Sequence, residues 1–181
     1  MLPSLRSQLD AVVARRSNFE AQARGMSEAQ LRFRPAPGAW SISEVADHLM
    51  HAEKEAIKAT TKDGVERRGQ RRTLKQLLAA KGFRAVTWLN IRIKVPAKVA
   101  GLVTPGSTPD LNALWAQWRD AHDQLERYLE TIGPGDVDYM AFRHPIMGPT
   151  RVDGILPFFT QHFDHHMKQV RRIRASPGFP R

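Results

Sequence analysis

Apolar residues recur at three- and four-residue steps in several stretches of the chain, which is the period of an amphipathic helix. The first stretch runs from Leu2 to Arg24 and ends near Gly25. Its apolar positions are Leu5, Leu9, Val12, Val13 and Phe19. The segment 34–43 that follows, RPAPGAWSIS, contains two prolines and a glycine, which interrupt regular helices. We therefore predict a helix over residues 2–24, followed by a turn or an extended connection.

A second helix is predicted to begin after Ser41. Ser41 and Glu44 have the spacing of a capping box, in which the serine oxygen accepts the amide of the third helical residue and the glutamate reaches back. The inward stripe that follows consists of Ile42, Val45, Leu49, Ala52 and Ala56. We expect this helix to extend to about Thr60.

Two further long helices are predicted in the second half of the chain. The third helix starts at a Thr108 or Asp110 cap and stops at the sequence Gly133-Pro134-Gly135. The fourth helix has one apolar side, formed by Ile155, Leu156, Phe159, Phe163, Val170 and Ile173. Between the second and third helices, residues 62–98 are predicted to form a long connection that holds a short extra helix.

The number and type of these elements predict an all-α helical bundle. Four substantial amphipathic helices are present without a clear alternating strand pattern, and the connection 142–154 is expected to be rich in turns. At 181 residues the chain is long enough for one domain with its own core. We assign residues 1–175 to this domain and expect residues 176–181 to form a frayed tail.

Composition narrows the class of protein. The chain is 41% hydrophobic and 25% charged, as in ordinary globular proteins, and no apolar run approaches the roughly 20 residues that span a bilayer. The N-terminus lacks the apolar core of a secretory signal, so a cytoplasmic protein is expected. Cysteine is absent, which excludes disulfides, thiolate metal ligands and a protein thiol nucleophile. Any metal ion must therefore be bound by nitrogen or oxygen.

The positive charge is concentrated in one segment. The formal net charge of the chain is +10, and residues 62–98 contain eleven lysines and arginines against Asp63 and Glu66. Such a segment can bind nucleic acid, an anionic membrane or an acidic cosubstrate, although it is more often only a solvated face. Few aromatic residues lie between the basic ones, which disfavours a platform for single-stranded nucleic acid.

The last helix contains three histidines within five positions. His162 and His166 are four residues apart, so they share one helix face, and they interrupt its apolar side. Two buried imidazoles need hydrogen bonds or a metal ion, and a pair with this spacing can chelate one ion. The alternative is a pair of core histidines bonded to carbonyl or carboxylate groups. His165 falls among polar residues and is expected to be solvated.

A third ligand would have to come from another element, because catalytic metal sites usually have three protein ligands. His48 lies beside the inward stripe of the second helix, and His51 is the competing candidate. Ligand histidines usually donate their second nitrogen to a carboxylate or carbonyl group, and Glu44, Asp47 and Glu53 are candidates for this role. Carboxylates at such positions are more often surface charges, so they rank below the histidines as site residues.

Two other residues have both a structural and a functional interpretation. His144, in the connection before the last helix, is either part of a structural turn or a proton shuttle near neutral pH. Trp40 is interpreted as a packing residue at the start of the second helix. The motifs GxSxG, GxGxxG and the P-loop are absent, which disfavours serine hydrolases, dinucleotide enzymes and P-loop enzymes.

The segments 34–53, RPAPGAWSISEVADHLMHAE, and 142–173, FRHPIMGPTRVDGILPFFTQHFDHHMKQVRRI, resemble the two signature regions of the DinB-like superfamily, of the DinB_2 and YfiT-like type. The resemblance spans essentially the whole chain. It rests on a Trp-Ser turn before a helix that carries the first histidine, and on an HxxxH helix with a trailing Gln. It implies an up-down-down-up four-helix bundle in which His48, His162 and His166 bind a divalent metal ion such as nickel, zinc or iron.

The resemblance also implies an enzyme that acts on a small-molecule substrate, either a metal-dependent hydrolase or a transferase that uses a low-molecular-weight thiol as cosubstrate. Three neutral imidazoles leave the charge of the ion uncompensated, so bound water or thiol loses its proton more readily. A homodimer is expected, because the apolar helix faces exceed what one bundle buries. The rival hypothesis is a non-catalytic stress-response or binding protein that engages a polyanion through residues 62–98, with structural histidines.

Overall fold

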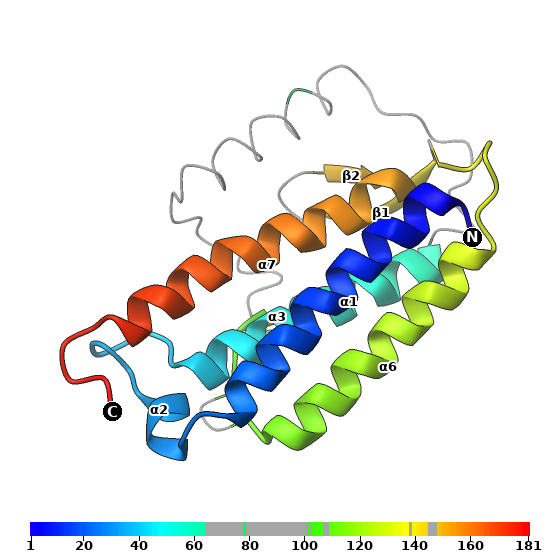
Figure 1. Cartoon of the computed structure of the whole chain (residues 1–181). Coiled ribbons are helices and arrows are strands. Elements are labelled where there is room, and N and C mark those ends of the chain that lie inside the picture. The colour runs from blue at the N-terminus through cyan, green and yellow to red at the C-terminus, as the bar shows by residue number, and fades with distance from the viewer. Residues whose placement is uncertain (64–77, 79–100, 102, 107–108, 138, 145–147) are drawn as a thin grey trace.

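The computed structural model describes residues 1–63, 78, 101, 103–106, 109–137, 139–144 and 148–181 (Figure 1). Four long helices form the body of the protein: α1 (Pro3–Arg24), α3 (Ile42–Asp63), α6 (Leu111–Glu130) and α7 (Val152–Arg174). The smaller elements are the helix α2 (Glu28–Arg32) and the strands β1 (Met140–His144) and β2 (Gly148–Arg151). The two strands pair antiparallel and lead directly into α7.

The four long helices form a bundle with an up-down-down-up order. α1 and α7 run in one direction and α3 and α6 run in the other (Figure 1). α3 packs against α6 and α7, and α1 packs against α7 and α6, so α1 and α3 occupy diagonal positions. The parallel neighbours α3 and α6 require a connection that returns along the length of the bundle. The all-α bundle predicted from the helical periods is therefore confirmed, and so is the topology that the family resemblance implied.

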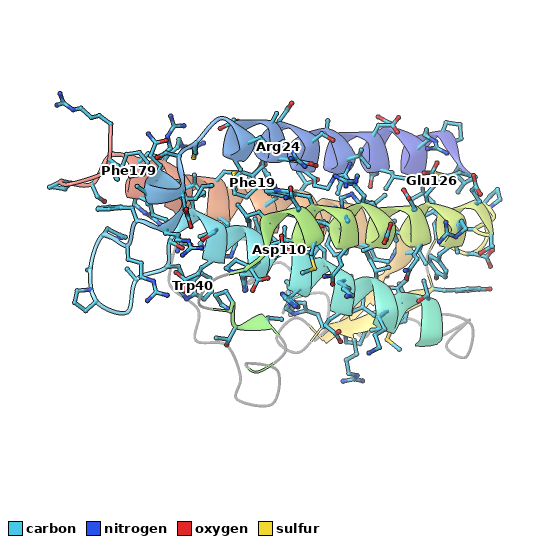
Figure 2. The ribbon with its side chains drawn as sticks, turned by 90° about the horizontal axis from the view of Figure 1, so that it is seen from below. Phe19, Arg24, Trp40, Asp110, Glu126 and Phe179 are labelled. Atoms are coloured by element: carbon cyan, nitrogen blue, oxygen red, sulfur yellow. The ribbon has the colours of Figure 1, made fainter. Side chains whose placement is uncertain are left out.

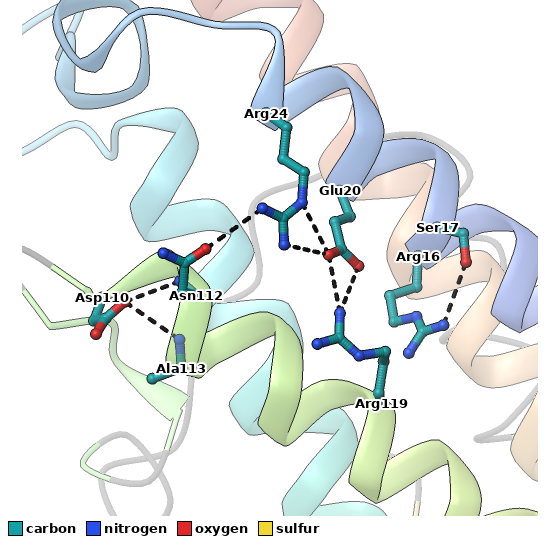
Figure 3. A network of polar contacts seen from close by, with 8 residues as sticks. All are labelled: Arg16, Ser17, Glu20, Arg24, Asp110, Asn112, Ala113 and Arg119. Atoms are coloured by element: carbon teal, nitrogen blue, oxygen red, sulfur yellow. Dashed lines mark hydrogen bonds and ion pairs between the residues drawn. The ribbon is translucent and has the colours of Figure 1, made fainter.

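Capping residues fix where two of these helices begin. Ser41 and Glu44 form the predicted capping box: Ser41 Oγ accepts the Glu44 amide at 3.3 Å, and Glu44 Oε2 accepts the Ser41 amide at 2.8 Å. At the start of α6, Asp110 rather than Thr108 is the cap. Its carboxylate accepts the amides of Asn112 and Ala113 (Figure 3).

The core consists of two apolar clusters that follow one another along the bundle axis. One includes Leu9, Ile57, Leu125 and Phe159, and the other includes Phe19, Leu49, Trp115 and Phe163. Three buried polar residues, Arg16, Glu53 and His122, lie between the two clusters along α1, α3 and α6. The bundle therefore has a polar layer near its middle.

An exposed ion-pair network joins α1 to α6. Glu20 accepts hydrogen bonds from Arg24 at 2.8 Å and from Arg119 at 2.9 Å (Figure 3). Arg24 also reaches Asn112 in the first turn of α6, at 3.4 Å. The Arg24 and Arg119 side chains are about half exposed to solvent, so this network adds little to stability and serves mainly to fix how the two helices align.

Two small elements differ from the sequence-based prediction. The β1–β2 hairpin lies where a turn-rich connection was expected, because strands of five and four residues are too short to show a clear alternation, and a proline stands at position 149. α2 was not predicted, since five residues contain no full apolar period, although Ser27 and Gln30 form a capping box there.

The C-terminal residues are docked rather than frayed. The ring of Phe179 lies edge-on to Phe33 with the centroids 5.5 Å apart, and the Gln30 side-chain amide donates to the Pro180 carbonyl at 3.1 Å. Figure 2 shows Phe179 and Glu126 toward opposite ends of the bundle. Partial burial of the Phe179 ring against Phe33 offsets the cost of ordering a few terminal residues, which explains the difference from the expected frayed tail.

The short extra helix and the basic segment predicted within residues 62–98 lie almost entirely outside the described residues. In the described part of the chain, no helix combines the length and the apolar character needed to cross a membrane.

Candidate metal centre

Three histidines converge at the seam between α3 and α7. His48 comes from α3, and His162 and His166 come from successive turns of α7. One ring nitrogen of each lies within 4.8 Å of the others, and the Nε2 atoms of His48 and His162 are 3.3 Å apart. His48 and His166 are buried and His162 is half-buried. The structure thus brings together the three residues that the resemblance indicated.

Hydrogen bonds on the opposite side of two rings determine which nitrogen is available. His48 Nδ1 lies 2.7 Å from the Val103 carbonyl oxygen, which can only accept, so this nitrogen carries the proton. His166 Nδ1 donates in the same way to Gln169 Oε1 at 3.0 Å. In the neutral form of each ring the lone pair therefore resides on Nε2. His162 Nδ1 is buried without a hydrogen-bond partner among the described residues.

The donor set fits a divalent metal ion. Nitrogens that bind one ion at about 2.1 Å with a near-tetrahedral angle lie about 3.4 Å apart, and the His48–His162 separation of 3.3 Å is close to this value. No further histidine or carboxylate joins the three within the residues that the structure describes. Three protein ligands are characteristic of catalytic sites, which keep a position open for water or substrate, whereas structural sites are usually closed by four.

Burial keeps all three imidazoles neutral. Burial lowers the pKa of His48, although the hydrogen bond to Val103 opposes this effect. Burial together with the neighbouring histidines holds the pKa of His162 well below its ordinary value, and burial lowers the pKa of His166 to about 3. Protons therefore do not compete for the ring nitrogens at neutral pH, and the lone pairs are available to a metal ion.

Aromatic rings enclose the cluster on two sides. The Trp40 ring lies 4.8 Å from the His48 ring and is stacked 6.2 Å from that of His166. Phe158 stacks on His162 with an interplanar angle of 10° and a centroid distance of 5.7 Å. Trp40, interpreted from the sequence as a packing residue, thus also forms a wall of the site. Phe158 was not singled out, because its position in an apolar stretch gives no sign of a role near the histidines.

The competing histidines have other environments. His51 Nδ1 bonds to the Asp47 backbone carbonyl at 2.9 Å and does not join the cluster. His144 lies in β1 with its ring 4.9 Å from Phe158, and burial lowers its pKa to about 4. A role as a proton shuttle stays a prediction. His165 is half-buried against the His166 ring rather than solvated as expected.

None of the three candidate carboxylates bonds directly to a cluster histidine. Glu44 caps α3 and accepts two hydrogen bonds from Arg34. Burial raises the pKa of Glu44, but the hydrogen bonds from the Ser41 amide and from Arg34 together outweigh this effect and lower it. Glu53 lies in the polar layer of the core, where Trp118 Nε1 and His122 Nε2 each approach it to 2.7 Å. Asp47 accepts the backbone amide of Gly106. Neutral oxygens, the carbonyl of Val103 and the amide of Gln169, take the expected role instead. Gln169 follows His166 at a one-turn spacing in the sequence, whereas no sequence signal identifies a backbone carbonyl.

Comparisons with known proteins agree with this geometry. The family profile of the DinB superfamily matches residues 11–170. The solved structure of YfiT from Bacillus subtilis, described as a probable metal-dependent hydrolase with an unusual four-helix bundle topology, matches with a TM-score of 0.60. The alignment covers 97% of this chain and 88% of that one at 13% sequence identity, so it shows a shared fold. No curated protein matches the chain by sequence.

Proposed function

The chain belongs to the DinB superfamily, and we propose that it is a metal-dependent hydrolase that binds one divalent ion through His48, His162 and His166. The observation that carries this proposal is the convergence of three neutral imidazoles at the seam between α3 and α7. The Nδ1 atoms of His48 and His166 are already hydrogen-bonded, which leaves Nε2 of each ring available to a shared ion. The description of YfiT as a probable metal-dependent hydrolase supports the choice of reaction class.

An ion held by three neutral ligands supplies Lewis acidity, which lowers the pKa of water and polarises a carbonyl or phosphoryl oxygen. The protein residues have separate tasks. His48, His162 and His166 provide the donor atoms, while Val103 and Gln169 hold two of these rings in the required tautomer. Trp40 and Phe158 flank the histidines with apolar surface, which limits water and leaves contacts for an apolar part of a small substrate.

A thiol-dependent transferase is the second candidate for the same site. The chain contains no cysteine, so the sulfur would have to come from a low-molecular-weight thiol cosubstrate. The three-histidine site suits this chemistry as well, because a cationic centre lowers the pKa of a thiol as it does that of water.

One experiment separates the two candidates. The protein is stripped with a chelator, reconstituted separately with zinc, nickel and ferrous ions, and assayed on chromogenic esters and amides with and without added thiols. The hydrolase proposal predicts turnover that requires metal but no thiol. Turnover that requires a thiol and an electrophilic acceptor would favour the transferase, and turnover unchanged by metal removal would reject both.

A non-catalytic function rests on a different observation, the eleven basic residues between Lys62 and Lys98. If these residues bind a polyanion, binding to duplex DNA or to anionic vesicles weakens steeply as salt rises. Neutralising Arg67, Arg68, Arg71 and Arg72 together would weaken it further. Binding that responds to neither change would exclude this function.

A further inference from the structure

A short segment of chain, residues 103–106, is attached to α3 beside the three histidines by two hydrogen bonds. At one end the Val103 carbonyl oxygen accepts from His48 Nδ1 at 2.7 Å. At the other end the Gly106 amide donates to Asp47 Oδ2 at 2.8 Å. Because Asp47 and His48 are consecutive in α3, the two bonds hold the segment 103–106 by both ends against one turn of the helix.

The Asp47 carboxylate is buried without a lysine or arginine partner among the described residues. Its side chain is 8% exposed, and a buried carboxylate needs partners to offset the loss of hydration. Its near partners are the Gly106 amide and His51 Nδ1 at 3.3 Å. The Gly106 bond is the shorter of the two, so holding the segment 103–106 is a principal task of this carboxylate.

We propose that Asp47 is a positioning residue for the metal centre: by anchoring Gly106 it holds the Val103 carbonyl on His48, and it thereby couples metal binding to the docking of the segment 103–106. This inference rests on the proposed metal site and assigns a regulatory element to it. Asp47 itself does not touch the metal-binding nitrogens.

The coupling has a direct physical origin. A metal ion on Nε2 withdraws electron density from the imidazole, which makes Nδ1–H a stronger donor to the Val103 carbonyl. A docked carbonyl in turn holds the ring in the tautomer that leaves Nε2 free. By thermodynamic linkage, the factor by which undocking of the segment weakens metal binding equals the factor by which bound metal suppresses undocking.

Zinc affinity, measured by competition with a chromogenic chelator, tests the proposal. We expect Asp47→Ala, which removes the acceptor, and Gly106→Pro, which removes the donor, each to weaken zinc binding by about tenfold or more, the usual effect of losing a residue that orients a metal ligand. Gly106→Pro removes the donating amide without changing charge, so it separates anchoring from the electrostatic attraction of Asp47. Both variants break the same hydrogen bond, that between the Gly106 amide and Asp47. The double variant should therefore bind zinc no more weakly than the weaker-binding single variant.

Two matched controls accompany these variants. Gly106→Ala keeps the amide, and its new Cβ would meet only Asp47 Oδ2, at an ordinary 3.8 Å, so it should bind zinc as the wild type does. His51→Gln removes the other partner of Asp47 and should likewise leave zinc affinity unchanged. Hydrogen exchange provides a readout that does not depend on activity: zinc should slow exchange of the Gly106 amide in the wild type but not in Asp47→Ala.

The outcomes distinguish a failure of the proposed metal site from a failure of its coupling to the segment 103–106. If the wild type binds neither zinc nor nickel nor ferrous ion, the proposed metal site fails and the coupling fails with it. If the wild type binds zinc but Gly106→Pro binds equally well, or if zinc leaves exchange at Gly106 unchanged, only the coupling is wrong. Weakening by Asp47→Ala alone would mean that the carboxylate acts through its charge rather than as an anchor.

Discussion

The chemistry of each buried histidine is determined by the partner of its second nitrogen. Burial keeps His48 and His166 neutral, and their Nδ1 atoms donate to neutral oxygens, which leaves the lone pair on Nε2. His122 instead faces the Glu53 carboxylate at 2.7 Å within the core, far along the chain from either signature region. The same residue type therefore serves as a candidate ligand in one place and as part of a buried polar pair in another, and the partner distinguishes them.

The polar layer predicts a large effect for one substitution. Glu53→Ala leaves the buried Trp118 and His122 donors without their acceptor, and we expect it to lower the free energy of unfolding by about 3 kcal/mol or more. Urea titration measures this change. Glu126→Ala is the matched control, because its exposed bond to Arg6 should contribute less than about 1 kcal/mol. Similar losses for both variants would contradict a buried, paired role for Glu53.

At the scale of the element, α3 is the helix on which the site depends, because it carries both His48 and Asp47. Its first turn is held by the Ser41 capping box, while Arg34 ties the capping glutamate to the preceding loop. Every residue from Ser41 to Met50 is buried, so this end of the helix is enclosed on all sides. The position of His48 therefore follows from where α3 starts.

Removal of the cap should be measurable in unfolding experiments. We expect Ser41→Ala to destabilise the protein by about 1 kcal/mol, because it leaves the Glu44 amide in the first turn without its acceptor. Ser7→Ala, at an exposed position inside α1, serves as the control and should be neutral or slightly stabilising. Equal stability of Ser41→Ala and wild type would show that the cap is replaceable.

Prediction from sequence succeeded where a long apolar period exists. The four long helices follow from repeating apolar positions, and the inward direction of His162 and His166 follows from the same period. The hairpin, α2 and the docked tail were missed because each spans only a few residues and depends on tertiary contacts such as Phe33 with Phe179. Convergence of His48 with α7 was implied only by family resemblance, since periodicity within one helix carries no information on which helix packs against it.

At the scale of the whole molecule, the buried histidines make the stability of the metal-free protein depend on pH. Burial lowers the pKa values of His48, His144, His162 and His166, so the unfolded chain binds protons below about pH 6.5 that the folded chain does not. Stability should therefore be fully present above this pH and fall as the pH drops from about 6.5 toward 4. Each histidine contributes up to about 1.4 kcal/mol per pH unit.

Unfolding by urea at several pH values, after metal removal, measures this dependence. Of the four histidines, His144 is the one outside the metal centre. His144→Phe removes its titration and should flatten the dependence of the free energy of unfolding on pH between pH 6 and about 4. The pKa values of two carboxylates are also lowered, that of Glu20 by its arginine partners and that of Glu44 by the Ser41 amide and Arg34. Their contribution to stability is lost only below about pH 4.5 and does not obscure this range. A stability that stays constant from pH 7 to 5 would contradict the burial of neutral histidines.

Elemental analysis of untagged protein tests the metal site most directly, because a histidine tag would itself bind metal. We predict about one divalent ion per chain in the wild type, retained in the control His165→Ala and lost in His162→Ala. Absence of metal from the wild type after reconstitution with nickel, zinc and iron would contradict the account, as would full retention of metal by His162→Ala.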